Sequence, residues 1–211
     1  MARSEKAERT YQQILEASTK LFFTQGYEKT SIQDILDEVK MSRGVVYYYF
    51  KSKKEILDAI AGQRLDIIRS FIKEAHADNA REKIVKILSM IIDEGEETDE
   101  GALPIEHMAD PHIVLANMQA QMNDAKLMAS LLEEGIRDGS IKTDYPLQLA
   151  ELMSMLLNTW LNPILFNRDL EQTKMHLKFV QQTLSKLGAD VLTDKMVNRV
   201  TNNLNRSGCF N

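Results

Sequence analysis

The chain has 211 residues, of which 44% are hydrophobic, and it contains only 4 Pro and 9 Gly. Leu, Ile, Met, Ala, Glu and Lys dominate and alternating β-branched stretches are almost absent, so we expect an all-α protein. No apolar run reaches the roughly 18 residues of a membrane span, and the first residues are charged rather than signal-like. The single Cys209 has no partner for a disulfide. These features predict a cytoplasmic protein without membrane association.

The net charge of −5 is distributed unevenly along the chain. Residues 1–60 contain 10 Lys/Arg and 9 Asp/Glu, a net charge of +1, whereas residues 61–211 contain 16 and 22, a net charge of −6. One segment has five basic residues and no acidic one: Lys40, Arg43, Lys51, Lys53 and Lys54. Because attraction to phosphate depends on charge within about 10 Å, the acidic total does not exclude a nucleic-acid partner for this segment.

Two helices are predicted before this basic segment. The first covers residues 6–25, and Gly26 is expected to end it. Thr30 and Gln33 form a capping-box pattern, which predicts a second helix over residues 31–39.

A short third helix is predicted over residues 43–50, after a tight turn and with Ser42 as its N-cap. It carries three consecutive tyrosines. Val46 and Phe50 lie four residues apart, so we expect them to face the other two helices. The opposite face then remains for a ligand, and a short basic helix supported by a neighbouring helix suits the major groove of DNA.

The rest of the chain reads as a larger helical domain. Ser52 and Glu55 form a second capping box, which begins a fourth helix of about 22 residues, or some 33 Å. We expect helices around residues 84–91, 115–136, 147–166 and 170–187, an acidic loop over 93–101, and a short helix over 103–109. The predicted domains are residues 1–52, 53–195 and a polar C-terminal tail, 196–211.

The helix over residues 147–166 is apolar almost all round, so it requires cover on both sides. We expect a second copy of the chain to provide one cover, in a four-helix interface with the helix over 170–187. Pro163 should kink or end the first of these helices. The predicted interface residues are Leu156, Trp160, Leu177, Val180 and Leu184.

Nine of the eleven methionines follow residue 89. A methionine-lined cavity adapts to varied apolar ligands, although each methionine taken singly is more often core packing. The predicted lining of a small-molecule pocket is Met90, Met118, Met122, Met153 and Trp160.

A metal site is not predicted. His107 and His112 flank Asp110, with Glu106 adjacent, but this spacing fits no standard helical pair and Pro111 intervenes. A polar loop or a ligand contact is the preferred interpretation. Catalytic constellations and cofactor motifs are absent from the sequence, so we expect neither enzymatic activity nor a cofactor.

The segment Thr30–Leu57, with SRGVVYYYFKSKKEIL from Ser42, closely resembles the N-terminal helix-turn-helix of TetR-family transcriptional regulators. The preceding FFTQGYEKTS resembles the end of that family's first helix. The motif covers about 50 residues, and the remainder resembles the family only in helix number and in its paired terminal helices. The resemblance implies a homodimeric regulator, usually a repressor, that binds a palindromic operator with its third helix. A small molecule in the C-terminal domain would move the fourth helix as a lever.

The resemblance also implies roles for individual residues. Positions that contact base edges are Arg43, Gly44, Val45 and Tyr48. Positions that contact phosphate are Thr30, Ser42, Tyr47, Tyr49 and Lys53. An arginine can make a bidentate contact to guanine, worth about 1–3 kcal/mol of discrimination. Val45 is often Thr in the family, and Tyr48 or Tyr49 is often His, so the operator sequence does not follow from the motif.

Two other classes of protein remain as alternatives. One is a helical enzyme or small-molecule carrier that kept the fold without DNA binding. The other is an adaptor that uses the N-terminal domain on a protein. An adaptor would tolerate neutralisation of Arg43 and Lys53, whereas a DNA reader would not. Activation instead of repression also remains open, as do the effector and the target genes.

Overall fold

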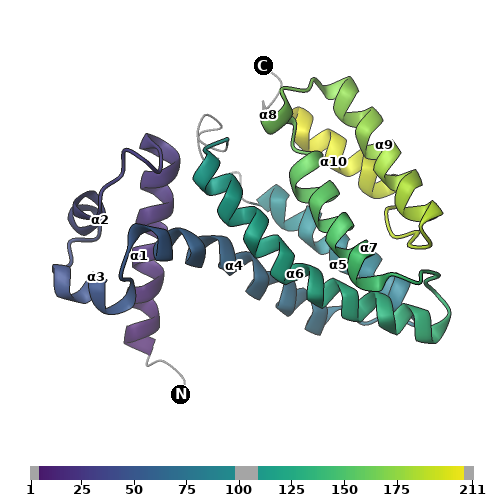
Figure 1. Cartoon of the computed structure of the whole chain (residues 1–211), viewed down its shortest axis with the longest axis horizontal. Coiled ribbons are helices and arrows are strands. Elements are labelled where there is room, and N and C mark those ends of the chain that lie inside the picture. The colour runs from purple at the N-terminus through teal and green to yellow at the C-terminus, as the bar shows by residue number, and fades with distance from the viewer. Residues whose placement is uncertain (1–4, 98–108, 207–211) are drawn as a thin grey trace. The chain divides into compact units, whose positions relative to one another are not determined.

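The computed structural model describes residues 5–97 and 109–206, and these residues form helices and turns with no strand among them (Figure 1). The prediction of an all-α protein is confirmed. The first five helices are α1 (Glu5–Gln25), α2 (Ile32–Val39), α3 (Arg43–Tyr49), α4 (Lys53–Glu74) and α5 (Ala80–Glu97). They are followed by α6 (Pro111–Asp138), α7 (Pro146–Ser154), the π-helical turn η2 (Met155–Trp160), α8 (Pro163–Phe166), α9 (Leu170–Lys186) and α10 (Asp194–Arg206).

The described residues form two compact units. The N-terminal unit comprises residues 5–64 and 109–117, and the C-terminal unit comprises residues 65–97 and 118–206. Both α4 and α6 therefore contribute residues to each unit. This division differs from the predicted boundary after residue 52, because the first turns of α4 bury Ile56 and Leu57 in the N-terminal unit.

The N-terminal unit has a small apolar core made by residues at helical spacing. α1 packs on α2, and Gly26, which has a φ of +92°, ends α1 as predicted. A positive φ costs glycine little, so the chain can reverse here. The fully or nearly fully buried side chains of this core are Ile14, Leu15, Phe22, Ile35, Leu36, Val46, Phe50, Ile56 and Leu57.

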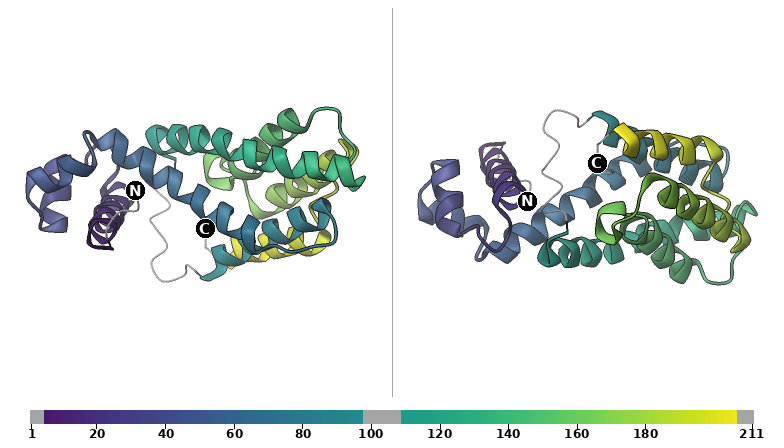
Figure 2. Two further views of the ribbon diagram at one scale, coloured as in Figure 1. Left: turned by 90° about the horizontal axis from the view of Figure 1, so that it is seen from below. Right: turned by 90° about the horizontal axis from the view of Figure 1, so that it is seen from above.

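The C-terminal unit holds the larger core, to which α5, α6, α7, α9 and α10 contribute. α10 packs on both α9 and α5, as the two views of Figure 2 show. The prediction of a polar tail over residues 196–211 is therefore wrong for residues 196–206. Met196 and Thr201 are 3% and 9% exposed, because the few apolar residues of this polar segment lie on one face of a helix.

One predicted loop and one predicted helix also differ from the structure. α5 continues to Glu97, so residues 93–97 of the predicted acidic loop are helical, and residues 98–101 lie outside the described part of the chain. Most of the short helix predicted over 103–109 lies outside it as well. The helix predicted over 147–166 is divided into α7, η2 and α8, and Pro163 occupies the first turn of α8, where its missing N–H is not needed.

Neither a membrane-spanning helix nor a cluster of metal ligands is found among the described residues. No helix within residues 5–97 and 109–206 combines the length and hydropathy of a membrane span. No group of three His, Cys, Asp or Glu side chains in those ranges is arranged to hold a metal ion.

Candidate DNA-binding surface

The second helix of the N-terminal unit starts at a reciprocal capping box. The Ser31 backbone N–H donates to Asp34 Oδ2 at 2.7 Å, and the Asp34 N–H donates to Ser31 Oγ at 3.1 Å. The predicted Thr30–Gln33 box was therefore wrong by one residue. Asp34 is the better acceptor because its short carboxylate reaches the N-cap directly, and the Ser31 N–H holds the pKa of this carboxyl below its usual value. The capping fixes where α2 begins.

The turn that follows α2 sets the start of α3. Lys40 adopts a left-handed conformation with a φ of 53°, and its N–H donates to the Leu36 carbonyl. Ser42 is the N-cap of α3 by position, as predicted, but its hydroxyl makes no capping hydrogen bond. That hydroxyl consequently remains available to another partner.

Helix α3 has one buried and one exposed face. Val46 and Phe50 are 1% and 5% exposed, and the Phe50 ring stacks on Tyr11 of α1 at 5.1 Å. These inward positions are confirmed. On the other face Val45 and Tyr48 are 39% and 75% exposed. Arg43 and Gly44 are exposed on the same helix, so the structure presents all four predicted base-contact residues to solvent.

The space beside Gly44 is open. A Cβ built at this position would meet no atom of the chain within 4 Å. Glycine within a helix costs up to about 1 kcal/mol relative to alanine. The fold therefore does not require glycine here. A ligand that must approach the α3 backbone closely would require it.

The tyrosines of α3 differ in exposure and in contacts. Tyr47 is half-buried, and the Arg43 guanidinium lies over its ring at 5.5 Å. Tyr49, also half-buried, packs edge-on against Tyr48 at 5.0 Å and lies 6.2 Å from the Tyr11 ring. Tyr47 and Tyr49 thus position the two exposed side chains, Arg43 and Tyr48.

A hollow of about 490 Å³ lies between α1 and α3. Its lining combines side chains from the first turns of α1 with the exposed face of α3: Lys6, Ala7, Thr10, Ser42, Gly44, Val45, Tyr48 and Tyr49. Five of the nine predicted DNA-contact residues are therefore gathered around one surface depression. Lys6, Ala7 and Thr10 could not be identified from the sequence, because their helical spacing does not reveal that α1 lies beside α3.

Only some of the basic side chains of this region form ion pairs or hydrogen bonds within the chain. Lys54 pairs with Asp58 at 2.7 Å, and Lys51 Nζ donates to the Tyr47 carbonyl at 2.6 Å. Lys40 and Arg43 are exposed and form no ion pair with a carboxylate of the described residues. Their charge remains for an anionic partner.

Thr30 and Lys53 make hydrogen bonds within the chain that the sequence did not predict. Thr30 is 1% exposed, and its hydroxyl donates to the Gly26 carbonyl at 2.8 Å. Lys53 Nζ donates to the carbonyls of Tyr27 at 2.6 Å and of Thr30 at 2.9 Å, and it lies 4.1 Å from the Tyr27 ring centroid. These contacts use the groups that were predicted to bind phosphate, and they fix the connection between α1 and α2.

Two of the residues considered for a metal site, Asp110 and His112, lie in a polar cluster with Glu28. His112, at the start of α6, lies 3.1 Å from Glu28 Oε1 and 3.4 Å from Asp110 Oδ1. Its ring stacks on Tyr27 at 4.9 Å. His107 and Glu106 lie outside the described residues. The described part of the cluster attaches the start of α6 to the connection between α1 and α2.

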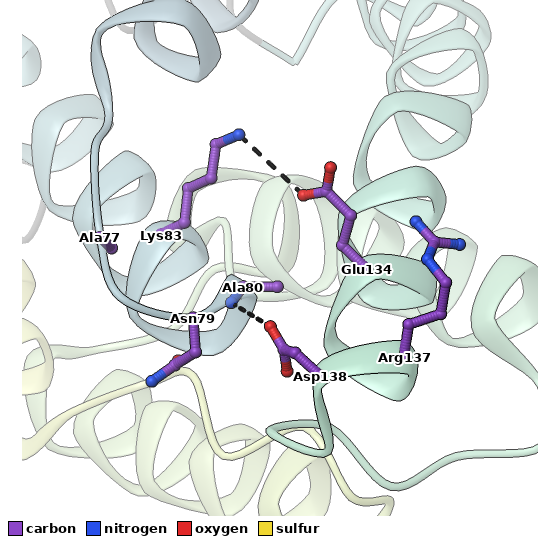
Figure 3. Close-up of a pocket in the computed structure, with 7 residues that line it drawn as sticks. All are labelled: Ala77, Asn79, Ala80, Lys83, Glu134, Arg137 and Asp138. Atoms are coloured by element: carbon purple, nitrogen blue, oxygen red, sulfur yellow. Dashed lines mark hydrogen bonds and ion pairs between the residues drawn. The ribbon is translucent and has the colours of Figure 1, made fainter.

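A second hollow, of about 450 Å³, lies in the C-terminal unit at the start of α5 and the end of α6 (Figure 3). Two cations and two carboxylates line it, with Lys83 Nζ 4.0 Å from Glu134 Oε2. The first four backbone N–H groups of α5 already have acceptors, namely Asp138 Oδ2, Ser140 Oγ, Asn79 Oδ1 and the Asn79 carbonyl. This arrangement caps a helix and offers no free donors to an anion.

The predicted pocket residues do not line either of these hollows. Met153 is 2% exposed within the core, whereas Met90, Met118, Met122 and Trp160 are half-buried. All six residues of η2 are half-buried, in contrast to the neighbouring turns of α7. π-Helical turns are rare and often occur at functional sites.

Three of the predicted dimer residues are wrong. Leu177, Val180 and Leu184 are at most 4% exposed within a single chain, so they pack in its own core and are not available to another copy. These residues form an apolar face of α9, as the spacing predicted, but that face packs against other helices of the same chain. The exposed apolar side chains of this region are Phe166, Met175 and Phe179, at 47%, 72% and 58% exposure.

A helix-turn-helix whose second helix exposes cationic and aromatic side chains beside an open glycine defines a DNA-binding domain. The family model described as "Bacterial regulatory proteins, tetR family" matches residues 14–60, which include α2, α3 and the start of α4. The match confirms the TetR-family helix-turn-helix that the motif predicted for this segment of the chain. The description of this model names regulatory proteins and no enzyme.

Two curated relatives illustrate how the similarity is distributed. An uncharacterised HTH-type regulator of Lactococcus lactis is 45% identical over 58 residues, which cover 28% of this chain and 30% of that protein. The chain thus spans less than a third of the length of this relative. The HTH-type transcriptional repressor KstR2 of Rhodococcus jostii is 24% identical over 144 residues, covering 65% of this chain and 71% of that protein.

Solved structures resemble the chain over most of its length. A TetR-family regulator of Syntrophomonas wolfei superposes with a TM-score of 0.65 at 20% identity, over 89% of this chain and 98% of the other. RolR in complex with resorcinol superposes with a TM-score of 0.59 at 14% identity, over 94% and 96%. At these identities the comparisons establish the fold of the C-terminal helices and nothing finer.

Proposed function

We propose that the chain regulates transcription by binding an operator with the exposed face of α3. The observation that carries the proposal is the division of α3 into two faces. Val46 and Phe50 are buried, while Arg43, Val45 and Tyr48 face solvent. In a helix-turn-helix the second helix enters the major groove, where such side chains reach base edges.

Contacts to the DNA backbone would surround this reading face. Ser42 and the Tyr47 and Tyr49 hydroxyls remain the proposed phosphate ligands, and exposed Lys40 and Lys6 add positive charge. Backbone contacts orient the helix without reading sequence. Thr30 and Lys53 support this surface through the connection between α1 and α2 instead of binding phosphate themselves.

The proposed active form is a homodimer that binds a palindromic site. Phe166 of α8 and Met175 and Phe179 of α9 are exposed apolar residues, and we call this set the α8–α9 patch. Phe179 lies 6.0 Å from the Trp160 ring, so the patch adjoins η2. Contiguous exposed apolar surface marks association sites, and a two-fold dimer uses one self-complementary patch on each copy. Trp160 and the half-buried Leu156 remain candidates for its edge.

The proposed effector is a small apolar molecule that releases the protein from DNA, as a repressor would require. Half-buried apolar residues from several helices border the core of the C-terminal unit: Phe71, Ile72, Ile91, Ile92, Met128, Leu156, Leu157 and Trp160. They offer apolar area to a ligand. The resemblance to RolR, whose solved complex contains resorcinol, and to KstR2, named a repressor, supports this part of the proposal.

The experiment that tests the function is selection of bound sequences from a random duplex pool, followed by titration of the selected site at several salt concentrations. A palindromic consensus bound with a steep salt slope is the expected result. The same duplex then serves to screen small aromatic molecules for release. Sequence-independent binding alone would contradict the proposal and favour the carrier or adaptor alternatives.

A further inference from the structure

We propose that the hollow between α1 and α3 receives the 5-methyl group of a thymine, so that each half of the operator carries a T·A pair at this position. The inference rests on the proposed function, since it names the base that the same surface reads. It concerns the described residues that line the hollow, and it assigns a role to α1 that the family motif does not contain.

The apolar groups of the lining come from both helices. α3 contributes Val45 and the ring of Tyr48, which are 39% and 75% exposed, and α1 contributes Ala7 and the methyl group of Thr10. The Thr10 hydroxyl donates to the Lys6 carbonyl at 3.0 Å, which turns the polar end of this side chain toward its own helix. The hollow therefore offers apolar contacts on two sides.

The position of Gly44 allows a base edge to enter. A Cβ at residue 44 would meet nothing of the chain within 4 Å, so the space over this residue is open to an approaching ligand. Gly44 itself lines the hollow. A flat base edge can thus come close to the α3 backbone here, between Val45 and Tyr48.

The chemistry of the lining favours thymine over adenine and cytosine. In the major groove, cytosine and adenine present amino groups, which donate hydrogen bonds to carboxylate or amide side chains. Thymine presents a methyl group, which apolar side chains contact. No carboxylate or amide side chain lines this hollow. Lys6 is its cationic residue, and Arg43 and Lys40 lie exposed nearby on the same unit, so an anionic duplex is the partner whose charge fits.

The test removes single methyl groups from the DNA. In the operator selected above, each thymine of a half-site is replaced in turn by deoxyuridine, which keeps base pairing and hydrogen bonds. At one position we expect about a fourfold loss of affinity, the equivalent of one buried methyl group. Val45→Ala enlarges the hollow and should reduce that loss to less than about twofold.

A matched control and the contrary outcomes complete the design. Val39→Ala removes the same atoms from α2, outside the hollow, and should keep the fourfold effect of deoxyuridine. If no thymine responds, or if the response is the same in V45A, the inference fails while the bound operator still supports the proposed function. If no sequence is selected from the pool, the proposed function itself fails.

Discussion

At Gly44, helix stability favours alanine, whereas the proposed DNA contact favours glycine. Nothing of the chain lies within 4 Å of a Cβ at this position, so Gly44→Ala is sterically free in the unbound protein. We expect the substitution to raise the free energy of unfolding by about 0.5–1 kcal/mol, because alanine favours the helix. It should weaken operator binding, since the methyl group stands where a base edge approaches. Thermal unfolding and a binding titration on one preparation measure both effects.

A fall in stability together with unchanged affinity would contradict this account of Gly44. Gly62 supplies a matched control, because its Cβ position is also open but lies in α4, away from the reading face. Gly62→Ala should stabilise the helix similarly and leave the direct contacts of α3 with bases intact.

Arg43 carries the proposed contact to guanine, and its guanidinium lies over the Tyr47 ring. Arg43→Ala should lower operator affinity by about 5- to 150-fold, the equivalent of 1–3 kcal/mol, with an unchanged circular dichroism spectrum. Arg43→Lys keeps the charge without the bidentate geometry, so it should retain binding to random DNA and lose discrimination. Equal operator affinity in the alanine variant would remove Arg43 from the site.

At the residue scale the sequence predicted the reading face well. Arg43, Gly44, Val45 and Tyr48 are exposed because Val46 and Phe50 occupy the inward positions, and that division follows from spacing on a single short helix. Their contacts with DNA stay a prediction. The role of Thr30 was not predicted correctly, because its hydroxyl is buried and donates to the Gly26 carbonyl, a contact that the sequence pattern does not show.

At the scale of elements, Lys53 connects α4 to the link between α1 and α2. Its ammonium donates to two carbonyls, 26 and 23 residues earlier in the chain. Lys53→Met keeps the aliphatic stem and removes the donors, so we expect the free energy of unfolding to fall by about 1–3 kcal/mol. The salt slope of DNA binding should hardly change. Chemical denaturation and salt titrations test the two statements separately.

The opposite pattern would restore Lys53 as a phosphate ligand: unchanged stability and a salt slope lower by about one unit. Lys54→Met is the neighbouring control. The Lys54 ammonium pairs with Asp58 at the surface, so its loss should alter stability by less than about 1 kcal/mol.

The start of α5 depends on an acidic side chain from the end of α6. Hydrogen bonds from Ser140 and from the Ala80 N–H hold the pKa of Asp138 below its ordinary value of 3.8. A carboxyl whose pKa is lower in the folded state stabilises the protein above the unfolded value. Asp138→Asn should therefore lower Tm by a constant amount down to about pH 3.8, and the difference should shrink at more acidic pH.

Thermal scans across that pH range measure the difference. Exposed Glu133, on the same helix, provides the comparison as Glu133→Gln. A difference that grows on acidification would show that the Asp138 hydrogen bonds contribute nothing as an ionised cap.

The extents of the elements were largely predictable, since α1, α4 and α9 follow from apolar spacing and capping residues. The interruption by η2 was not, because a π-helical turn inserts extra residues without a sequence signal as clear as proline. α10 was missed for a different reason. Its few apolar residues become a core face only once α5 and α9 are placed beside it.

At the scale of the whole molecule, we expect the α8–α9 patch to join two copies of the chain, so that two α3 helices bind one operator together. Phe179 is 58% exposed, so Phe179→Asp should leave the chain folded while preventing association. Loss of bivalent binding lowers avidity by about 100- to 10,000-fold. We expect a monomer in sedimentation experiments and a corresponding loss of operator affinity. A dimer in F179D would locate the interface elsewhere.

Two controls separate association from folding. Ser130→Asp places the same charge on an exposed position of α6 and should remain dimeric. Leu177→Asp places it in the core, where Leu177 is 4% exposed, and should unfold the C-terminal unit. The apolar pattern of α9 suited either role, because a seam looks the same in sequence whether its cover is the same chain or another copy.

The placement of Trp160 also gives the protein an intrinsic fluorescent probe in the C-terminal unit. It is the single tryptophan of the chain, so all indole emission originates at η2. The Arg168 guanidinium lies 4.9 Å from its ring centroid and the His176 ring 4.6 Å, with Phe179 at the edge of the α8–α9 patch. We expect occupation of the apolar border by the proposed effector, or separation of the proposed dimer, to change the polarity around this one fluorophore. Both events can thus be followed in the unlabelled protein, by the wavelength and the anisotropy of its emission.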